Sequence, residues 1–224
     1  MGGEAAIIVF IFVAVGFAWT WLWRQRVTEK PWLQEGLVDD HPSEIDHTQP
    51  PARTALYVFL AVVASVFSLF FSAYFLRMEY FDWRPLQEPG LLWVNTVMLV
   101  LGSVSIQMAA NAAKKSNIDM VGLGLIGTGI FTVAFIGGQL WAWQMLVAEG
   151  VYLYSNPANA FFYLITGLHA LHIVGGLYVW ARTTRRVWAG HPIHEIHLSV
   201  DLCKVYWHFL LMVWVVMFGL MLST

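Results

Sequence analysis

The stretch VGLGLIGTGIFTVAFIGGQLWAWQMLV, residues 121–147, contains no Asp, Glu, Lys or Arg. A helix needs about 20 apolar residues, each rising about 1.5 Å, to cross about 30 Å of hydrocarbon. This stretch exceeds that length. It therefore predicts a transmembrane helix that tilts, or that emerges from the bilayer at one end.

Five further apolar stretches meet the same criterion. Hydrophobic residues make up 58% of the 224-residue chain and charged residues 12%, with a mean hydropathy of +0.63. A soluble domain carries about twice that share of charges. We therefore predict an all-α, polytopic membrane helix bundle with six transmembrane helices, at residues 5–23, 54–76, 91–113, 121–147, 160–181 and 205–222.

The basic residues predict the orientation of these helices. Of the 12 Lys and Arg residues, Arg77 and Arg84 fall on one side of the six-helix arrangement and the other ten fall on the opposite side. The positive-inside rule places the ten in the cytoplasm and both termini in the periplasm. A Pro-rich, acidic stretch follows the first helix. We thus expect two parts, residues 1–53 with one helix and a cytoplasmic linker, and residues 54–224 with a five-helix bundle.

Charge also narrows the classes of function. The net charge of −2 gives no indication of a nucleic-acid partner. Cys203 is the single cysteine, so no internal disulfide forms. The predicted helices at 54–76, 91–113 and 121–147 contain no charged residue. Small-molecule transporters, pumps and channels usually carry such charges, so their absence favours a scaffold or partner subunit.

Neutral polar residues do occur within the predicted helices, among them Asn95, Thr96, Gln107, Gln139 and Gln144. Two interpretations are open. These side chains form hydrogen bonds between helices, each worth about 0.6–2 kcal/mol, or they line a polar pathway. A pathway lacks a titratable group here, which favours the first interpretation.

Histidines raise the alternative of a membrane cytochrome b. His169 and His172 share one helix face, and His208 lies in the last predicted helix. Axial haem ligands come from opposite sides of the iron. At 1.5 Å per residue from the predicted cytoplasmic ends, His172 lies roughly 13 Å deep and His208 roughly 5 Å deep. This mismatch argues against a bis-histidine haem.

A second histidine group, at positions 191, 194 and 197, lies between the last two predicted helices. If helical, this spacing brings imidazoles close enough to share a metal. No cysteine or second acid completes a ligand set, so a solvated cytoplasmic loop is the favoured interpretation.

Five motifs carry a resemblance to a known family. They are FSAYF at 71–75, LWVNT at 92–96, GQLWAW at 138–143, TGLHALHIVGG at 166–176 and YWHFL at 206–210. In this order, over residues 55–224, the chain resembles subunit III of the haem-copper cytochrome c oxidases. The resemblance implies an accessory subunit without a redox centre. Haem and copper are then expected on partner subunits, with catalytic subunit I and subunit II as the partners.

The resemblance also implies the setting and the residues of interest. The expected complex reduces oxygen to water in a bacterial cytoplasmic membrane, and this subunit binds phospholipids and supports proton uptake and turnover. A nitric oxide reductase is the alternative partner. The implied lipid-binding residues are Arg186, which matches a headgroup-binding arginine of the family, His172, His208 and Trp207. The motif residues implied to pack the bundle are Asn95, Thr96, Gln139 and His169. No catalytic, cofactor-binding or metal-binding residue is implied.

Two departures from the family pattern accompany the resemblance. Many members carry a buried glutamate that aligns near Val63, whereas this chain has no acid between Asp46 and Glu79. A role that depends on that carboxylate is therefore not expected. The fuller family form also has seven helices, with two before the five-helix block, and this sequence predicts one.

Overall fold

The computed structural model describes residues 51–86 and 89–223. They belong almost entirely to the second of two units into which the chain divides, residues 52–224. Every regular element in this part of the chain is an α-helix. The helices are α2 (Pro51–Met78), α3 (Leu91–Lys114), α4 (Ile118–Ala148), α5 (Pro157–Trp188) and α6 (Ile193–Leu222). The helix predicted at 5–23 lies outside the described residues.

All five helices are long and apolar enough to cross a membrane. Each contains one of the predicted spans at 54–76, 91–113, 121–147, 160–181 and 205–222. The five-helix part of the prediction is thus confirmed, and the protein is a multi-pass membrane protein.

The start of α6 corrects the prediction. The segment around His194 and His197 was expected to be a solvated loop, but the helix begins at Ile193. Ile196 and Val200 are buried and Cys203 follows one turn later, so apolar residues recur at helical spacing among polar ones. The polar residues lower the mean hydropathy of this stretch. The uninterrupted apolar run that predicts this helix therefore begins only at Val205.

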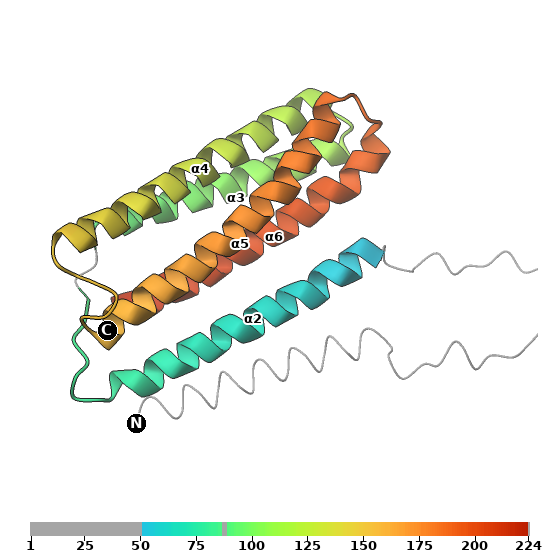
Figure 1. The fold of residues 1–224 in the computed structure, drawn as a ribbon. Helices are drawn as coiled ribbons and strands as arrows, with labels where there is room; N and C mark the ends of the chain where they lie inside the picture. The colour runs from blue at the N-terminus through green and yellow to red at the C-terminus, as the bar shows by residue number, and fades with distance from the viewer. Residues whose placement is uncertain (1–50, 87–88, 224) are drawn as a thin grey trace, which may run out of the picture. The chain divides into compact units, whose positions relative to one another are not determined.

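The helices α3 to α6 form one packed group, and α2 lies alongside it (Figure 1). The α3 helix packs against α4 and α6, and α5 packs against α4 and α6. Aromatic rings join α2 to this group. The ring centroid of Phe67 lies 6.3 Å from that of His169 on α5, and Phe59 lies 6.3 Å from Tyr206 on α6.

The α3–α4 connection is a tight hairpin. Ser116 has a positive φ of 56°, and its N–H donates to the carbonyl of Ala113 while that of Asn117 donates to Ala112. This pair of bonds ends α3 in a Schellman motif. The Asn117 side chain then caps α4 by accepting from the Met120 N–H at 3.2 Å. The hairpin therefore fixes the end of α3 relative to the start of α4.

Glycine lets α3 and α4 approach closely beyond this hairpin. A Cβ atom added to Gly124 would lie 2.8 Å from both the Ala109 Cβ and the Ser105 carbonyl oxygen. Small residues at such contacts are the usual device for close packing of membrane helices. The contact continues at Thr128 on α4, whose hydroxyl lies 3.5 Å from the Gly102 carbonyl of α3 and donates to the Gly124 carbonyl of its own helix at 2.8 Å.

At the other end of the bundle, two loops meet. Asn156 caps α5 by accepting from the Ala158 N–H at 3.3 Å, and its amide also donates to the Arg84 carbonyl. Trp83 packs edge-on against Tyr74 of α2, with ring centroids 4.8 Å apart. The loop after α2 is thus held against the loop before α5.

Candidate functional site

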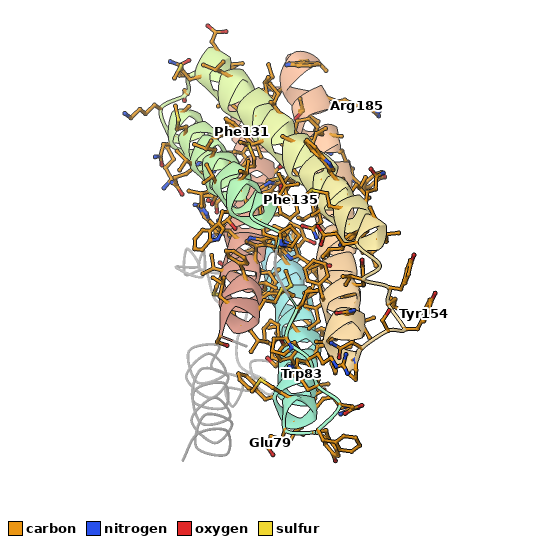
Figure 2. The ribbon with its side chains drawn as sticks, turned by 90° about the vertical axis from the view of Figure 1, so that its left-hand side faces the viewer. Glu79, Trp83, Phe131, Phe135, Tyr154 and Arg185 are labelled. Carbon is orange, nitrogen blue, oxygen red and sulfur yellow. The ribbon has the colours of Figure 1, made fainter. Side chains whose placement is uncertain are left out.

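His169 lies at the centre of the bundle. Its side chain on α5 is 0% exposed, and neither ring nitrogen has a hydrogen-bond partner among the described residues. Its ring centroid lies 6.0 Å from that of Phe135 on α4 and 5.4 Å from that of Trp214 on α6. The three rings around His169, those of Phe67, Phe135 and Trp214, come from three different helices, α2, α4 and α6. Figure 2 shows Phe135 pointing into the space between the helices. His169 therefore marks the point where α2, α4, α5 and α6 meet.

Asn95 and Gln139 form a buried amide pair between α3 and α4. Both are 1% exposed, and the Asn95 amide donates to Gln139 Oε1 at 3.2 Å. Gly138 makes room for the pair, because a Cβ atom there would lie 2.1 Å from Asn95 Oδ1. The three motif residues thus act together: the glycine admits the asparagine, and the asparagine orients the glutamine.

Three tryptophans donate their indole N–H to threonine hydroxyls on other helices. The pairs are Trp207 to Thr132 at 3.1 Å, Trp214 to Thr96 at 2.9 Å and Trp143 to Thr166 at 3.2 Å. Each threonine in turn donates to the backbone carbonyl four residues earlier. The threonine hydroxyl thus acts as donor and acceptor at once. Trp207 and Trp214 are buried and Trp143 is half-buried, each with its polar atom satisfied.

His208 is held between α6 and α3. Its Nδ1 contacts Ser103 Oγ, and its Nε2 lies 2.9 Å from Gln107 Oε1. The Gln107 amide donates onward to Asn111 at 3.0 Å. These contacts form a neutral hydrogen-bonded chain along α3. Both ring nitrogens of His208 are already engaged, so neither is directed at a ligand.

His172 and His208 lie at nearly the same level, which corrects the depth estimate. The Tyr206 hydroxyl donates to the His172 carbonyl at 2.8 Å, which sets His172 beside Tyr206. His208 is two residues further along α6, about 3 Å at the helical rise. The expected mismatch in depth came from placing the helix start at Val205. A different observation now disfavours a bis-histidine haem. Both ring nitrogens of His208 are bonded to α3, and the Nδ1 atom of His172 contacts the Leu168 carbonyl at 2.8 Å.

The residues implied for lipid binding separate into two environments. Trp207 is 4% exposed and donates to Thr132, so it belongs to the interior. His172 and Arg186 are half-buried on α5, about 21 Å apart along the helix axis and on nearly the same face. Between them on that face lie Gly175, where an added Cβ would meet no atom within 4 Å, and Val179, which is 49% exposed.

A charge cluster that the sequence did not reveal joins α2 to α6. Asp201 accepts from Arg53 at 2.7 Å and from Lys204 at 2.7 Å. Arg53 is in the first turn of α2, and Asp201 belongs to the helical segment that was expected to be a loop. The predicted helix begins at Val205 and so leaves Asp201 outside it. The sequence therefore did not indicate the pairing of Asp201 with Arg53.

The part of the chain that the structure describes brings no three His, Cys, Asp or Glu side chains together in a way that could hold a metal ion. The buried polar residues there are all uncharged amides, hydroxyls or histidine. The arrangement of the described residues provides interhelical packing and hydrogen bonding.

Comparison with known proteins agrees with the motifs. Residues 9–222 match the family model for cytochrome c oxidase subunit III. Cytochrome c oxidase subunit 3 of Thermostichus vulcanus is 30% identical over 181 residues, which cover 78% of this chain and 89% of the relative. The Synechocystis protein of the same name is 30% identical over 183 residues, covering 77% and 76%. A heme-copper oxidase subunit I+III of Aeropyrum pernix is 25% identical over 198 residues, covering 82% of this chain and 24% of the longer relative.

Proposed function

This chain belongs to the cytochrome c oxidase subunit III family, and from that premise we propose that it is the cofactor-free accessory subunit of an aerobic terminal oxidase. Its role is to stabilise the catalytic subunit while the complex reduces oxygen to water and translocates protons. We propose a bacterial cytoplasmic membrane as its location, with the basic ends of the helices in the cytoplasm.

One observation carries this proposal: neutral interhelical hydrogen bonds engage most of the buried polar side chains of the described residues, although His169 and the amide nitrogen of Gln139 lack a partner there. The Asn95–Gln139 pair and the tryptophan–threonine pairs use the polar groups that a reactive centre would need. Meanwhile large apolar side chains stay exposed along the helices, for example Leu69 at 72% and Leu171 at 66%. Such surfaces suit lipid and partner helices. The Aeropyrum pernix relative named subunit I+III supports subunit I as a partner, because its name places both subunits in one chain.

Lipid binding is the second part of the proposal. A phospholipid phosphate paired with Arg186 would send an acyl chain along the α5 face past Val179 and Gly175 towards His172. The open space at Gly175 supports this path. We expect Gly175→Phe to lower the amount of phospholipid that copurifies with the complex. Gly137→Phe on α4 is the matched control, since Gly137 is equally open.

Support for proton uptake is the third part, and it rests on the family resemblance. No acid lies between Asp46 and Glu79, so the contribution does not use a carboxylate near Val63. The groups that remain for it are surface side chains at the basic end of the bundle, where the ten Lys and Arg residues are expected.

Affinity purification through a tag on this chain tests the function. We expect a haem-copper catalytic subunit and subunit II to copurify and oxygen consumption to follow them. Deleting the chain should leave the haem spectrum of the remaining complex intact and shorten its active lifetime during turnover. A nitric oxide reductase catalytic chain in the purified complex would show that the partner is that enzyme and not an oxidase. A haem absorbance band that stays with the isolated polypeptide would contradict the proposal.

A further inference from the structure

A groove lies on the surface of the α3–α4 hairpin, and the residues that line it have no part in the proposed function. It has a volume of about 240 Å³. Its floor is made by residues with small side chains, Ser105 on α3 and Gly124 and Gly127 on α4. Bulkier residues stand beside them, including Leu123 at 59% exposure and Ile130 at 62%. The hollow exists because the glycines that allow α3 and α4 to approach also leave a space above their contact.

The size of the groove favours a single flexible chain as its occupant. On α4 it extends from Met120 to Ile130, about 15 Å at the helical rise. A helix with its side chains is about 10–12 Å across and does not enter a hollow of this volume. An extended hydrocarbon chain that lies along the two helices does.

Two exposed, oppositely charged side chains lie at the hairpin end of the groove. Lys115 directly follows the last residue of α3, seven positions after Met108, and Asp119 is one turn before Leu123 on the same face of α4. Neither takes part in an ion pair within the described part of the chain. The neighbouring Lys114 lies about 100° further round α3 and so points away from the face that carries Met108.

The charge pair selects a headgroup. A lysine ammonium attracts a lipid phosphate, and a carboxylate accepts hydrogen bonds from a primary ammonium. Phosphatidylethanolamine carries both groups, whereas phosphatidylglycerol offers only the phosphate and is repelled by Asp119. We propose that the α3–α4 groove binds one acyl chain of a phosphatidylethanolamine molecule, with its phosphate at Lys115 and its amino group at Asp119.

Groove filling tests the acyl-chain part. The purified complex that contains this chain is delipidated in detergent and exposed to dioleoyl phosphatidylethanolamine, and native mass spectrometry counts the retained lipids. We expect Ser105→Phe to retain one fewer phosphatidylethanolamine molecule. Ser65→Phe is the control: Ser65 on α2 is exposed and makes the same type of bond, to the carbonyl four residues earlier. It should retain the full number.

Headgroup exchange tests the charge pair without altering the groove. The measured quantity is the ratio of the affinities for phosphatidylethanolamine and dioleoyl phosphatidylglycerol in competition. Asp119→Asn should lower this ratio about two- to fivefold, the range expected of an exposed charge pair. Three results would overturn the proposal. They are an unchanged lipid count in Ser105→Phe, loss of the partner subunits from Ser105→Phe but not from Ser65→Phe, and equal binding of both lipids by the unmodified protein.

Discussion

The Trp207 indole N–H donates to the Thr132 hydroxyl at 3.1 Å, and both side chains are buried between α6 and α4. The same relationship recurs at Trp214 with Thr96 and at Trp143 with Thr166. Threonine suits this position because its hydroxyl satisfies its own helix while it accepts from the neighbouring ring. Large aromatic residues can therefore fill the bundle without leaving an unsatisfied donor in a low-dielectric interior.

Replacing Thr132 with valine should isolate the contribution of this bond. Valine keeps the shape and leaves the Trp207 N–H unsatisfied, so we expect a loss of about 1–2 kcal/mol in the free energy of unfolding. Thr132→Ser retains the hydroxyl and should lose less. Thermal unfolding in detergent, followed by tryptophan fluorescence, measures the difference. A valine variant as stable as the unmodified protein would show that the bond contributes nothing.

A second prediction concerns the close contact at Gly138. In Gly138→Ala the new methyl group would lie 2.1 Å from Asn95 Oδ1, so Asn95 must move and weaken its bond to Gln139. We expect a loss of about 1–3 kcal/mol. Gly137→Ala is the neighbouring control, because its Cβ meets no atom within 4 Å, and alanine there should be neutral or slightly stabilising. A similar loss in both variants would assign the effect to the helix backbone instead.

The five described helices could be predicted from the sequence because apolar runs such as 121–147 determine membrane insertion almost alone. The start of α6 could not, since Ile196 and Val200 alternate with polar residues and lower the local hydropathy. That error also displaced His208 and led to the wrong depth comparison with His172. The identity of the polar residues indicated interhelical bonding, but the pairs themselves, such as Trp207 with Thr132, depend on helix rotation and register. Hydropathy carries no information about either.

The loop after α2 gives a prediction on pH. The Arg77 guanidinium donates hydrogen bonds to the exposed Asp82 carboxylate and lowers the pKa of Asp82 below its usual value of 3.8. The ion pair is therefore complete above that usual value and is lost as the pH falls through the lowered pKa. We expect Arg77→Gln to return the Asp82 pKa towards its usual value, as measured by carboxyl-carbon NMR titration. Arg84→Gln, the other basic residue of this end, should leave it unchanged.

The last prediction concerns the first turns of α2. No described side chain of α2 before Leu60 is buried, so packing holds this end weakly. The ion pair of Arg53 with Asp201 joins it to α6 at 2.7 Å. Exposed or half-exposed pairs contribute about 1 kcal/mol or less to global stability, but a locally weak helix end depends on them more.

Asp201→Asn should therefore leave the unfolding temperature nearly unchanged and increase amide hydrogen exchange in the first turns of α2. Lys204→Gln separates the two partners of Asp201. It removes the i,i+3 pair within α6 and keeps the bond to Arg53, so exchange in α2 should stay slow. The charge-swapped double variant Arg53→Asp with Asp201→Arg should restore slow exchange, because the two side chains again attract across the same distance. If Lys204→Gln accelerates exchange as much as Asp201→Asn, the end of α2 is held by the charge of the cluster as a whole and not by the Arg53 bond.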